Sequence, residues 1–363
     1  MLLSRHRATD YRTALGAQDK TLIVLASTWG PRSLFGSHPD LAARLTTELP
    51  ADEYQVCAIM HPGITSAHSP YQLNAWLSEA QRAGLRVVPP ETGWQAAIMA
   101  ASCVISDYGS LALYAAAMDC PLLLTGNGTS TVPGSPMAAL TAQTARLDVD
   151  RALAPQLELA IRRHTPGDHN AIVKQAVGEP EVSAELLRPL VYRLLDLPEP
   201  ATEPVLPPID VPKYDRHTVP AFVVGAEDHG DTLVLRRFPS NGLRHDLDFR
   251  HLTADATHAT LRQITAASII HKGLSPDEGW RFDEWSAATL RQWPDARLVA
   301  ASLGPRTCLV RTRTDQRLTL TMPDTRVDPL VLASLVYVRG AELSTVDRIR
   351  IGEHVIEVTV QVH

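Results

Sequence analysis

The chain has 363 residues, of which 45% are hydrophobic and 20% are charged, and its formal net charge is −6 at pH 7. This length accommodates two or three domains, and a negative charge without any Lys/Arg-rich block argues against a nucleic-acid-binding protein. No apolar run reaches the roughly 18–20 residues that a membrane span needs, and the first seven residues become charged before a signal-peptide core could form. We therefore expect a cytoplasmic protein without a membrane span.

The first half of the chain alternates short β-branched runs with small amphipathic stretches. Continuous apolar runs, which are typical of strands covered on both faces, occupy residues 21–26, 55–60, 85–88, 103–106 and 121–125. Between them the spacing of apolar residues predicts helices near residues 37–49, 71–83, 94–102 and 110–118. Five strands separated by four helices predict a doubly wound, Rossmann-like parallel sheet of the α/β class.

The second half of the chain begins with a cluster of prolines and lacks the regular alternation of strands and helices. Seven prolines fall within residues 198–220, which excludes both helix and sheet and favours an extended linker. We therefore predict an α/β nucleotide-binding domain over residues 1–197, a proline-rich linker over 198–220 and a smaller α+β domain over 221–363. In that last domain we expect a hairpin at 221–224 and 232–237, helices near 256–272 and 281–293, a meander over 297–321, and a final helix and strand.

Residue types associated with metals and nucleophiles are scattered. The four cysteines lie in or beside apolar runs without a CxxC pair, so we expect buried, reduced thiols. His245, His251 and His258 recur with Asp246, Asp248 and Asp255 between them, but their spacing does not favour convergence on a metal. No phosphate-binding GxxxxGK[ST] loop, strand-linked GxGxxG or GxSxG elbow is present. We expect neither a bound metal nor a cofactor.

Candidate binding residues follow the predicted strands. Ligands of an open parallel sheet bind at the carboxyl ends of its strands, where helix N-termini present free N–H groups. The loops there hold several Gly, Ser and Thr residues, together with Arg32 and His61, a set that suits a diphosphate. The turn Asp107-Tyr108-Gly109-Ser110 is the most informative, because glycine allows close approach to an anion and serine can cap the next helix. A plain helix cap without a ligand explains the same turn.

Three of these loops resemble a known family. Residues 104–124 (VISDYGSLALYAAAMDCPLLL), the loop Ser27–Arg32 and the pair His61-Pro62 resemble, in this order, motifs of the CDP-glycerol glycerophosphotransferases of teichoic acid synthesis. The wider group is the GT-B glycosyltransferases and the related UDP-N-acetylglucosamine 2-epimerases. The resemblance implies that His61 and Ser110 contact the pyrophosphate of a CDP- or UDP-linked donor, with His61 acting in catalysis. It also places Thr28, Arg32, Asp107 and Gly109 in the donor site.

The resemblance has two departures. Gly109 stands where the family has a serine, so one hydroxyl contact to the donor is missing. The similarity also covers only about residues 10–195, which corresponds to the carboxyl-terminal, donor-binding half of the GT-B fold. We therefore expect either the donor-binding part of a glycosyl- or glycerophosphotransferase, whose acceptor-binding half is absent or lies on a partner protein, or a non-catalytic nucleotide-binding or scaffold protein.

Overall fold

The computed structural model divides the chain into two compact units. It describes residues 1–126, 131–178, 182–203, 205–214, 217–241 and 249–363. The first unit comprises Met1–Ala42, Gln55–Ser78 and Leu85–Arg216, and the second comprises Ala43–Tyr54, Glu79–Gly84 and His217–His363. Among the described residues, no helix combines the length and the apolar character that crossing a membrane would demand.

A five-stranded parallel sheet forms the centre of the first unit. Its strands are β1 (Thr21–Ser27), β2 (Tyr54–Met60), β3 (Arg86–Val88), β4 (Cys103–Ser106) and β5 (Leu122–Leu124). They lie in the order β3-β2-β1-β4-β5, with Val24 paired to Val104 and Val104 paired to Leu122. The strands are buried on both faces, which explains their continuous apolar sequences. The predicted Rossmann-like α/β sheet is confirmed.

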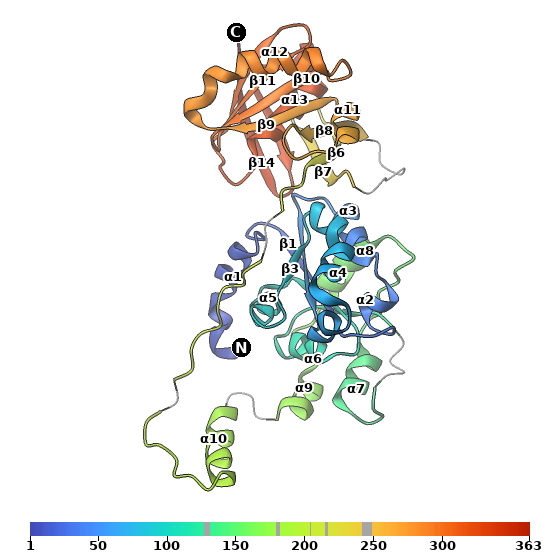
Figure 1. The fold of residues 1–363 in the computed structure, drawn as a ribbon, viewed down its shortest axis with the longest axis vertical. Helices are drawn as coiled ribbons and strands as arrows, with labels where there is room; N and C mark the ends of the chain where they lie inside the picture. Colours follow the sequence, from blue (N-terminus) through green and yellow to red (C-terminus); the bar gives the residue numbers. More distant parts are fainter. Residues whose placement is uncertain (127–130, 179–181, 204, 215–216, 242–248) are drawn as a thin grey trace. The chain divides into compact units, whose positions relative to one another are not determined.

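Helices cover the two faces of this sheet. Tyr11, Ala96 and Ala112 belong to three of them and pack against Val24 and Val104 in one cluster, and Figure 1 shows α1 and α5 on the opposite side of the sheet from α4. The helices are η1 (Leu2–Arg7), α1 (Ala8–Ala14), α2 (Leu34–Ser37), α3 (Leu41–Glu48), α4 (Pro62–Arg82), α5 (Trp94–Ala100), α6 (Ser110–Ala117), α7 (Pro136–Gln143), α8 (Leu153–Arg163), α9 (Asn170–Val177) and α10 (Ser183–Leu194).

Two helical segments that were not predicted precede predicted helices. The segment expected as one helix over 37–49 forms α2 and α3, because the Ser33 hydroxyl accepts from the Gly36 N–H and starts a short helical turn. The helix expected from residue 71 is confirmed as the second part of α4, whose first part begins at Pro62. Helix α4 is interrupted at Ser69, whose backbone angles (φ 67°, ψ 153°) are not helical and which precedes Pro70. Proline disfavours helical geometry in the residue before it, which accounts for the break at this position.

The proline-rich segment lies along the first unit. Residues 198–203 and 205–214 contain no helix or strand. The Tyr11 hydroxyl donates to the Ile209 carbonyl at 2.7 Å, and the Tyr214 hydroxyl donates to the Ala14 carbonyl at 2.8 Å. The Arg86 guanidinium donates to the Tyr214 hydroxyl and lies over its ring. The latter part of this segment is therefore packed against α1 and β3.

The second unit contains a closed barrel. Nine strands of the described chain lie in the order β10-β11-β12-β14-β13-β7-β6-β8-β9. Its elements are β6 (Ala221–Asp228), β7 (Leu233–Pro239), β8 (Phe249–Asp255), α11 (Leu261–Ala266), β9 (Ile269–Leu274), η2 (Pro276–Arg281), α12 (Phe282–Gln292), β10 (Leu298–Leu303), β11 (Thr307–Thr312), β12 (Arg317–Thr321), η3 (Pro329–Val331), α13 (Leu332–Arg339), η4 (Gly340–Glu342), β13 (Val346–Ile351) and β14 (His354–Val362). The predicted hairpin is β6–β7, and the predicted meander is β10–β11–β12.

One element of the second unit was predicted wrongly. The helix expected over 256–272 ends at Ala266, and the residues Ile269–Leu274 form β9, which runs parallel to β8 and β10. Ile269 and Ile270 are β-branched and fully buried between these two strands. Strand β8 was not predicted at all. Pairing with strands distant in the sequence thus overrides the local pattern here.

Candidate functional site

The strand order of the parallel sheet places one pair of loops at its switch point. The chain continues from β1 towards β2 and β3 on one side and returns to β4 and β5 on the other. Loops that follow the two central strands diverge at such a point and leave a crevice, which is where open α/β sheets bind ligands. Here these loops are residues 28–33 after β1 and 107–109 after β4, beside His61 after β2.

Asp107 joins the two loops. One oxygen of its buried carboxylate, Oδ2, accepts from the Thr28 N–H at 2.9 Å, the Thr28 hydroxyl at 2.8 Å and the Leu34 N–H at 2.8 Å. The other, Oδ1, accepts from the Gly109 N–H at 3.0 Å. Four donors of the chain therefore surround this carboxylate, and its role in the structure is to hold the loops after β1 and β4 together.

Gly109 is required by the closeness of these loops. A Cβ atom at this position would lie 2.4 Å from Cγ2 of Thr28, far inside van der Waals contact. The Thr28 side chain has little freedom to move away, because its hydroxyl is bound to Asp107. A serine at 109, as in the family that the sequence resembles, would collide with Thr28. The Cγ2 methyl group of Thr28 therefore occupies the space that a serine side chain at position 109 would need.

His61 presents one nitrogen outward. Its Nδ1 accepts a hydrogen bond of 2.9 Å from the Gly63 N–H, so Nδ1 is unprotonated and the neutral ring carries its proton on Nε2. The ring stacks against Trp29, with centroids 6.5 Å apart and planes inclined by 23°. The side chain is exposed. His61 is therefore oriented from two sides and offers an Nε2–H donor.

Ser110 begins helix α6 and is exposed. The residue that caps this helix is Gly109 rather than Ser110, and it supplies no side-chain hydrogen bond. The serine hydroxyl is thus not used as the cap that the sequence suggested. The first N–H groups of an α-helix lack partners within the helix, and their end of the helix carries partial positive charge. Ser110 therefore combines a hydroxyl with the N–H groups that begin α6.

These residues line one cavity of about 270 Å³. Of the residues predicted for the site, Thr28, His61, Asp107, Gly109 and Ser110 all border it, whereas Arg32 does not and lies exposed on the loop after β1. The remaining lining residues come from the same strands and from the start of α5 and α6: Ala26, Ser27, Ile59, Met60, Pro62, Pro90, Trp94, Ser106, Leu111 and Tyr114.

Trp94 and Tyr114 were not assigned to the site from the sequence. Their rings lie 5.2 Å apart, inclined by 48°, and both border the cavity. Trp94 follows the loop after β3, which is again a carboxyl end of a parallel strand, so the same rule that found His61 could have found it. Tyr114 lies one helical turn after Ser110, on the same side of α6. Together they place two aromatic rings beside the polar groups of the cavity.

Other predicted candidates lie elsewhere or outside the described residues. His245, Asp246 and Asp248, and the residues Asn127–Thr129 after β5, are among the residues that the structure does not describe. His251 is buried in the second unit, and its Nε2 lies 2.8 Å from the Ser334 hydroxyl. The four cysteines are buried and unpaired, as expected, and burial raises the pKa of both Cys57 and Cys103 to about 12. Neither of these two thiols serves as a nucleophile near neutral pH.

The first unit thus has the architecture of a Rossmann-like domain with its ligand crevice at the usual edge. Among solved structures, the chain is similar to HepE from Anabaena, solved in complex with UDP-glucose, at 13% identity with a TM-score of 0.31, over 51% of this chain and 52% of that one. It is also similar to the wall teichoic acid polymerase TagF, in a variant soaked with CDPG, at 15% identity with a TM-score of 0.28, over 53% of this chain and 47% of that one.

The chain spans about half the length of each of the two solved chains. No family model and no curated protein matches it.

Proposed function

We propose that the cavity at the carboxyl ends of β1, β2 and β4 binds the diphosphate of a nucleotide-linked donor, as the donor-binding part of a glycosyl- or glycerophosphotransferase. The observation that carries the proposal is the convergence of the α6 N-terminus, the Ser110 hydroxyl and the oriented His61 on this cavity. Helix N–H groups, a hydroxyl and a histidine are the donors that solvate phosphate oxygens. The resemblance to donor-binding enzymes supports the same ligand class.

In this proposal His61 donates from Nε2 to a phosphate oxygen of the donor. The Gly63 N–H holds Nδ1 and therefore fixes the tautomer with the proton on Nε2, even before a ligand arrives. During transfer, negative charge grows on the leaving phosphate, and a preorganised donor stabilises that charge more than it stabilises the bound substrate. His61 would thus contribute to catalysis as well as to binding.

Asp107 has an indirect role in the proposed site. Its oxygens are occupied by Thr28, Leu34 and Gly109, and it therefore positions the loops rather than meeting an anionic ligand. Trp94 and Tyr114 each offer an aromatic ring to the cavity, and such a ring suits the face of a nucleobase. A comparison of CDP- and UDP-linked ligands tests whether the cavity prefers cytosine or uracil.

The test is calorimetric titration of the full chain with CDP-glycerol, UDP-glucose, CDP and UDP. We expect at least one nucleotide diphosphate to bind and to raise the melting temperature, because such a ligand binds only the folded state. His61→Ala and Ser110→Ala should each weaken binding by about ten- to a hundredfold, since a hydrogen bond to a charged group is worth about 1.5–3 kcal/mol. His6→Ala and Ser66→Ala change exposed residues of the same types outside the cavity and should bind like the wild type.

The absence of binding by all four ligands at millimolar concentration would refute the proposal. Equal weakening by the cavity variants and their controls would also refute it. If a donor binds but is neither hydrolysed nor transferred by the full chain, donor binding stands and the proposed catalytic role of His61 fails for this chain alone.

A further inference from the structure

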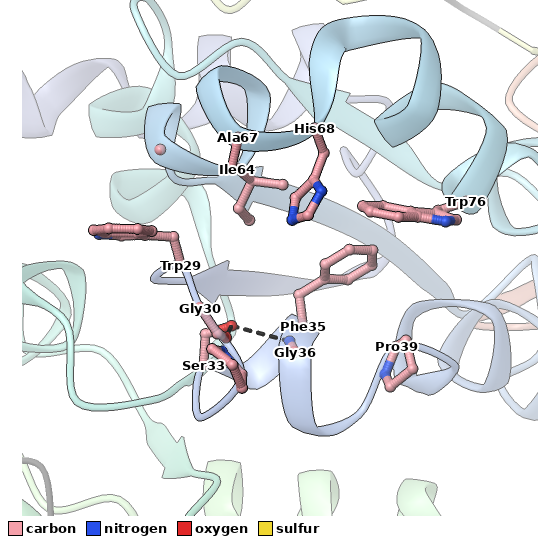
Figure 2. A pocket seen from close by; sticks show the side chains of 12 residues that line it. Trp29, Gly30, Ser33, Phe35, Gly36, Pro39, Ile64, Ala67, His68 and Trp76 are labelled. Atoms are coloured by element: carbon pink, nitrogen blue, oxygen red, sulfur yellow. Dashed lines mark hydrogen bonds between the residues drawn. The ribbon is translucent and has the colours of Figure 1, made fainter.

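A second cavity lies in the first unit, on the other side of Trp29. It measures about 470 Å³, within the size range of sites for small organic ligands. Figure 2 shows Trp29 and Trp76 at its two ends, with Phe35 from α2 on one side and Ile64, Ala67 and His68 from α4 on the other. The rest of its lining is Gly30, Pro31, Ser33, Gly36, Pro39 and Gly63.

The lining of this aromatic cavity carries no Asp, Glu, Lys or Arg. Three of its aromatic rings cluster around Trp76, whose centroid lies 5.9 Å from that of Phe35 and 5.0 Å from that of His68. Trp29 and Trp76 are nevertheless 57% and 43% exposed, so large apolar surfaces face the solvent here instead of a packed core. Exposed apolar surface of this kind in a concave site marks a place where a ligand binds.

Few polar groups of this cavity are available to a ligand. The Ser33 hydroxyl already donates to the Gly30 carbonyl and accepts from the Gly36 N–H, as Figure 2 shows for the second bond. The polar side-chain groups that remain for a ligand are the imidazole of His68 and the indole N–H groups of Trp29 and Trp76. A sugar carries several hydroxyl groups, and each one buried without a partner costs about 1–3 kcal/mol. This composition favours a hydrocarbon group over a carbohydrate.

The two cavities adjoin. Trp29 borders the aromatic cavity and stacks against His61. His61 in turn borders the cavity of about 270 Å³ at the ends of β1, β2 and β4, the donor cavity. A molecule with a polar end at His61 could therefore lay an apolar part across Trp29 towards Phe35 and Trp76. The break at Ser69 gives this arrangement its shape, because it separates the turn that carries Ile64, Ala67 and His68 from the turn that carries Trp76.

We infer that the aromatic cavity binds an uncharged alkyl chain, as the apolar part of an amphiphilic ligand. The binding of the chain does not depend on the proposed function, but its use as part of a lipid-like acceptor beside the donor rests on it. An alkyl chain buries its methylene groups against the rings without demanding hydrogen bonds, and each buried methylene contributes about 0.8 kcal/mol. A single polar head next to the chain would be served by His68 or His61.

The experiment uses three probes with the full chain and no nucleotide: octyl β-glucoside below its micelle concentration, 1-octanol, and methyl β-glucoside. Tryptophan emission and melting temperature report binding, because Trp29 and Trp76 become covered. We expect octyl glucoside and octanol to shift the emission to shorter wavelength and methyl glucoside to have no effect. Methyl glucoside acting as strongly as octyl glucoside would identify a carbohydrate site and overturn the proposal.

Matched variants locate the binding. Ala67→Phe places a ring from an exposed position of α4 into the cavity and should weaken octyl glucoside binding by at least about tenfold. Ala75→Phe makes the same change at an exposed residue of α4 outside the cavity and should leave binding unchanged. Equal binding by wild type and Ala67→Phe would show that the alkyl chain binds elsewhere. Because no nucleotide is present, this result is independent of whether the donor cavity binds its ligand.

Discussion

The two units of the molecule bury their polar groups in different ways. In the first unit the Asp107 carboxylate is surrounded by uncharged donors, three N–H groups and one hydroxyl. In the second unit buried charges face opposite charges: Arg237 pairs with Asp52 at 2.7 Å and with Asp328 at 2.8 Å, and Arg339 pairs with Asp347 at 2.7 Å. The first arrangement holds two loops around a cavity, whereas the second joins segments of a closed fold.

This difference predicts where a mutation acts. Loss of a neutralising partner inside the second unit leaves a buried charge and lowers the stability of that unit. Changes around Asp107 leave no charge without a partner, so they should cost less stability than the loss of a buried counter-charge, while they alter the shape of the candidate site. The four predictions below test this contrast, beginning with the largest expected effect.

Arg237→Met should destabilise the second unit by about 4 kcal/mol, because the largely buried carboxylate of Asp52 loses both hydrogen bonds to its counter-charge. The measurement is urea denaturation of the full chain. Arg236→Met is the matched control on the same strand: Arg236 is half-exposed, its nearest carboxylates lie 3.7 Å and 3.9 Å away, and such surface pairs are worth at most about 1 kcal/mol. Equal effects of the two substitutions would contradict the assigned role of Arg237.

Stability should fall as the pH is lowered, and His251 should contribute to the decrease. Burial lowers the pKa of His251 to about 4, from an ordinary value of 6.5. Between these values the unfolded chain binds a proton that the folded chain does not, so folding loses up to roughly 3 kcal/mol as the pH falls from 6.5 to 4. Above pH 6.5 the residue is neutral in both states and contributes no pH dependence.

The check for His251 is the free energy of unfolding measured at several pH values in the wild type and in His251→Gln. The variant keeps a group that can hydrogen-bond to Ser334 and should show a shallower decrease below pH 6.5. A residual slope is expected from His271, whose pKa is also lowered by burial. Identical slopes in the two proteins would show that His251 does not stay neutral in the folded chain.

Gly109→Ser should destabilise the first unit by about 2 kcal/mol, since its Cβ meets Cγ2 of Thr28. Thr28→Ser removes that methyl group and keeps the hydroxyl that donates to Asp107. The double variant should therefore recover most of the stability, and it would carry the serine of the related family. Thermal unfolding of the two single variants and the double variant measures the coupling; additive effects would contradict the contact.

Ser69→Gly should stabilise the chain by about 1 kcal/mol, which is the smallest effect in the series. The residue has φ 67° and ψ 153°, a conformation that costs about 1–3 kcal/mol in any residue except glycine. Ser69→Ala keeps the strain and loses the weak bond from the Gln72 N–H, so it should be destabilising. Opposite signs for the two substitutions in thermal unfolding are the expected result; the same sign would indicate that the backbone there is not strained.

The sequence predicted those parts of the molecule that depend on neighbouring residues. The strands β1, β2 and β4 were recognised because each is a continuous apolar run, and the polar loops after them were found because parallel strands end at one edge. Strand β8 was not predicted, and β9 was predicted as the end of a helix, because these strands are defined by pairing with other strands and not by their local spacing.

The sequence could not assign the detailed roles of the site residues. Asp107 binds the N–H groups of Thr28 and Leu34, which precede it by more than 70 positions, and no local pattern encodes such a contact. The aromatic cavity combines Trp29, Phe35 and Trp76 from three segments. Its lining spans the break at Ser69, and of the two helical segments that meet there only the second was predicted.

The contacts of the proline-rich segment with α1 and β3 determine where a truncated form of the protein should end. A protein truncated after residue 197, where the predicted linker begins, would deprive the buried Tyr11 hydroxyl of the Ile209 carbonyl and Arg86 of its contact with Tyr214. A protein ending after Tyr214 keeps both contacts. The choice of the last expressed residue therefore decides whether α1 and β3 keep their contacts with residues 205–214.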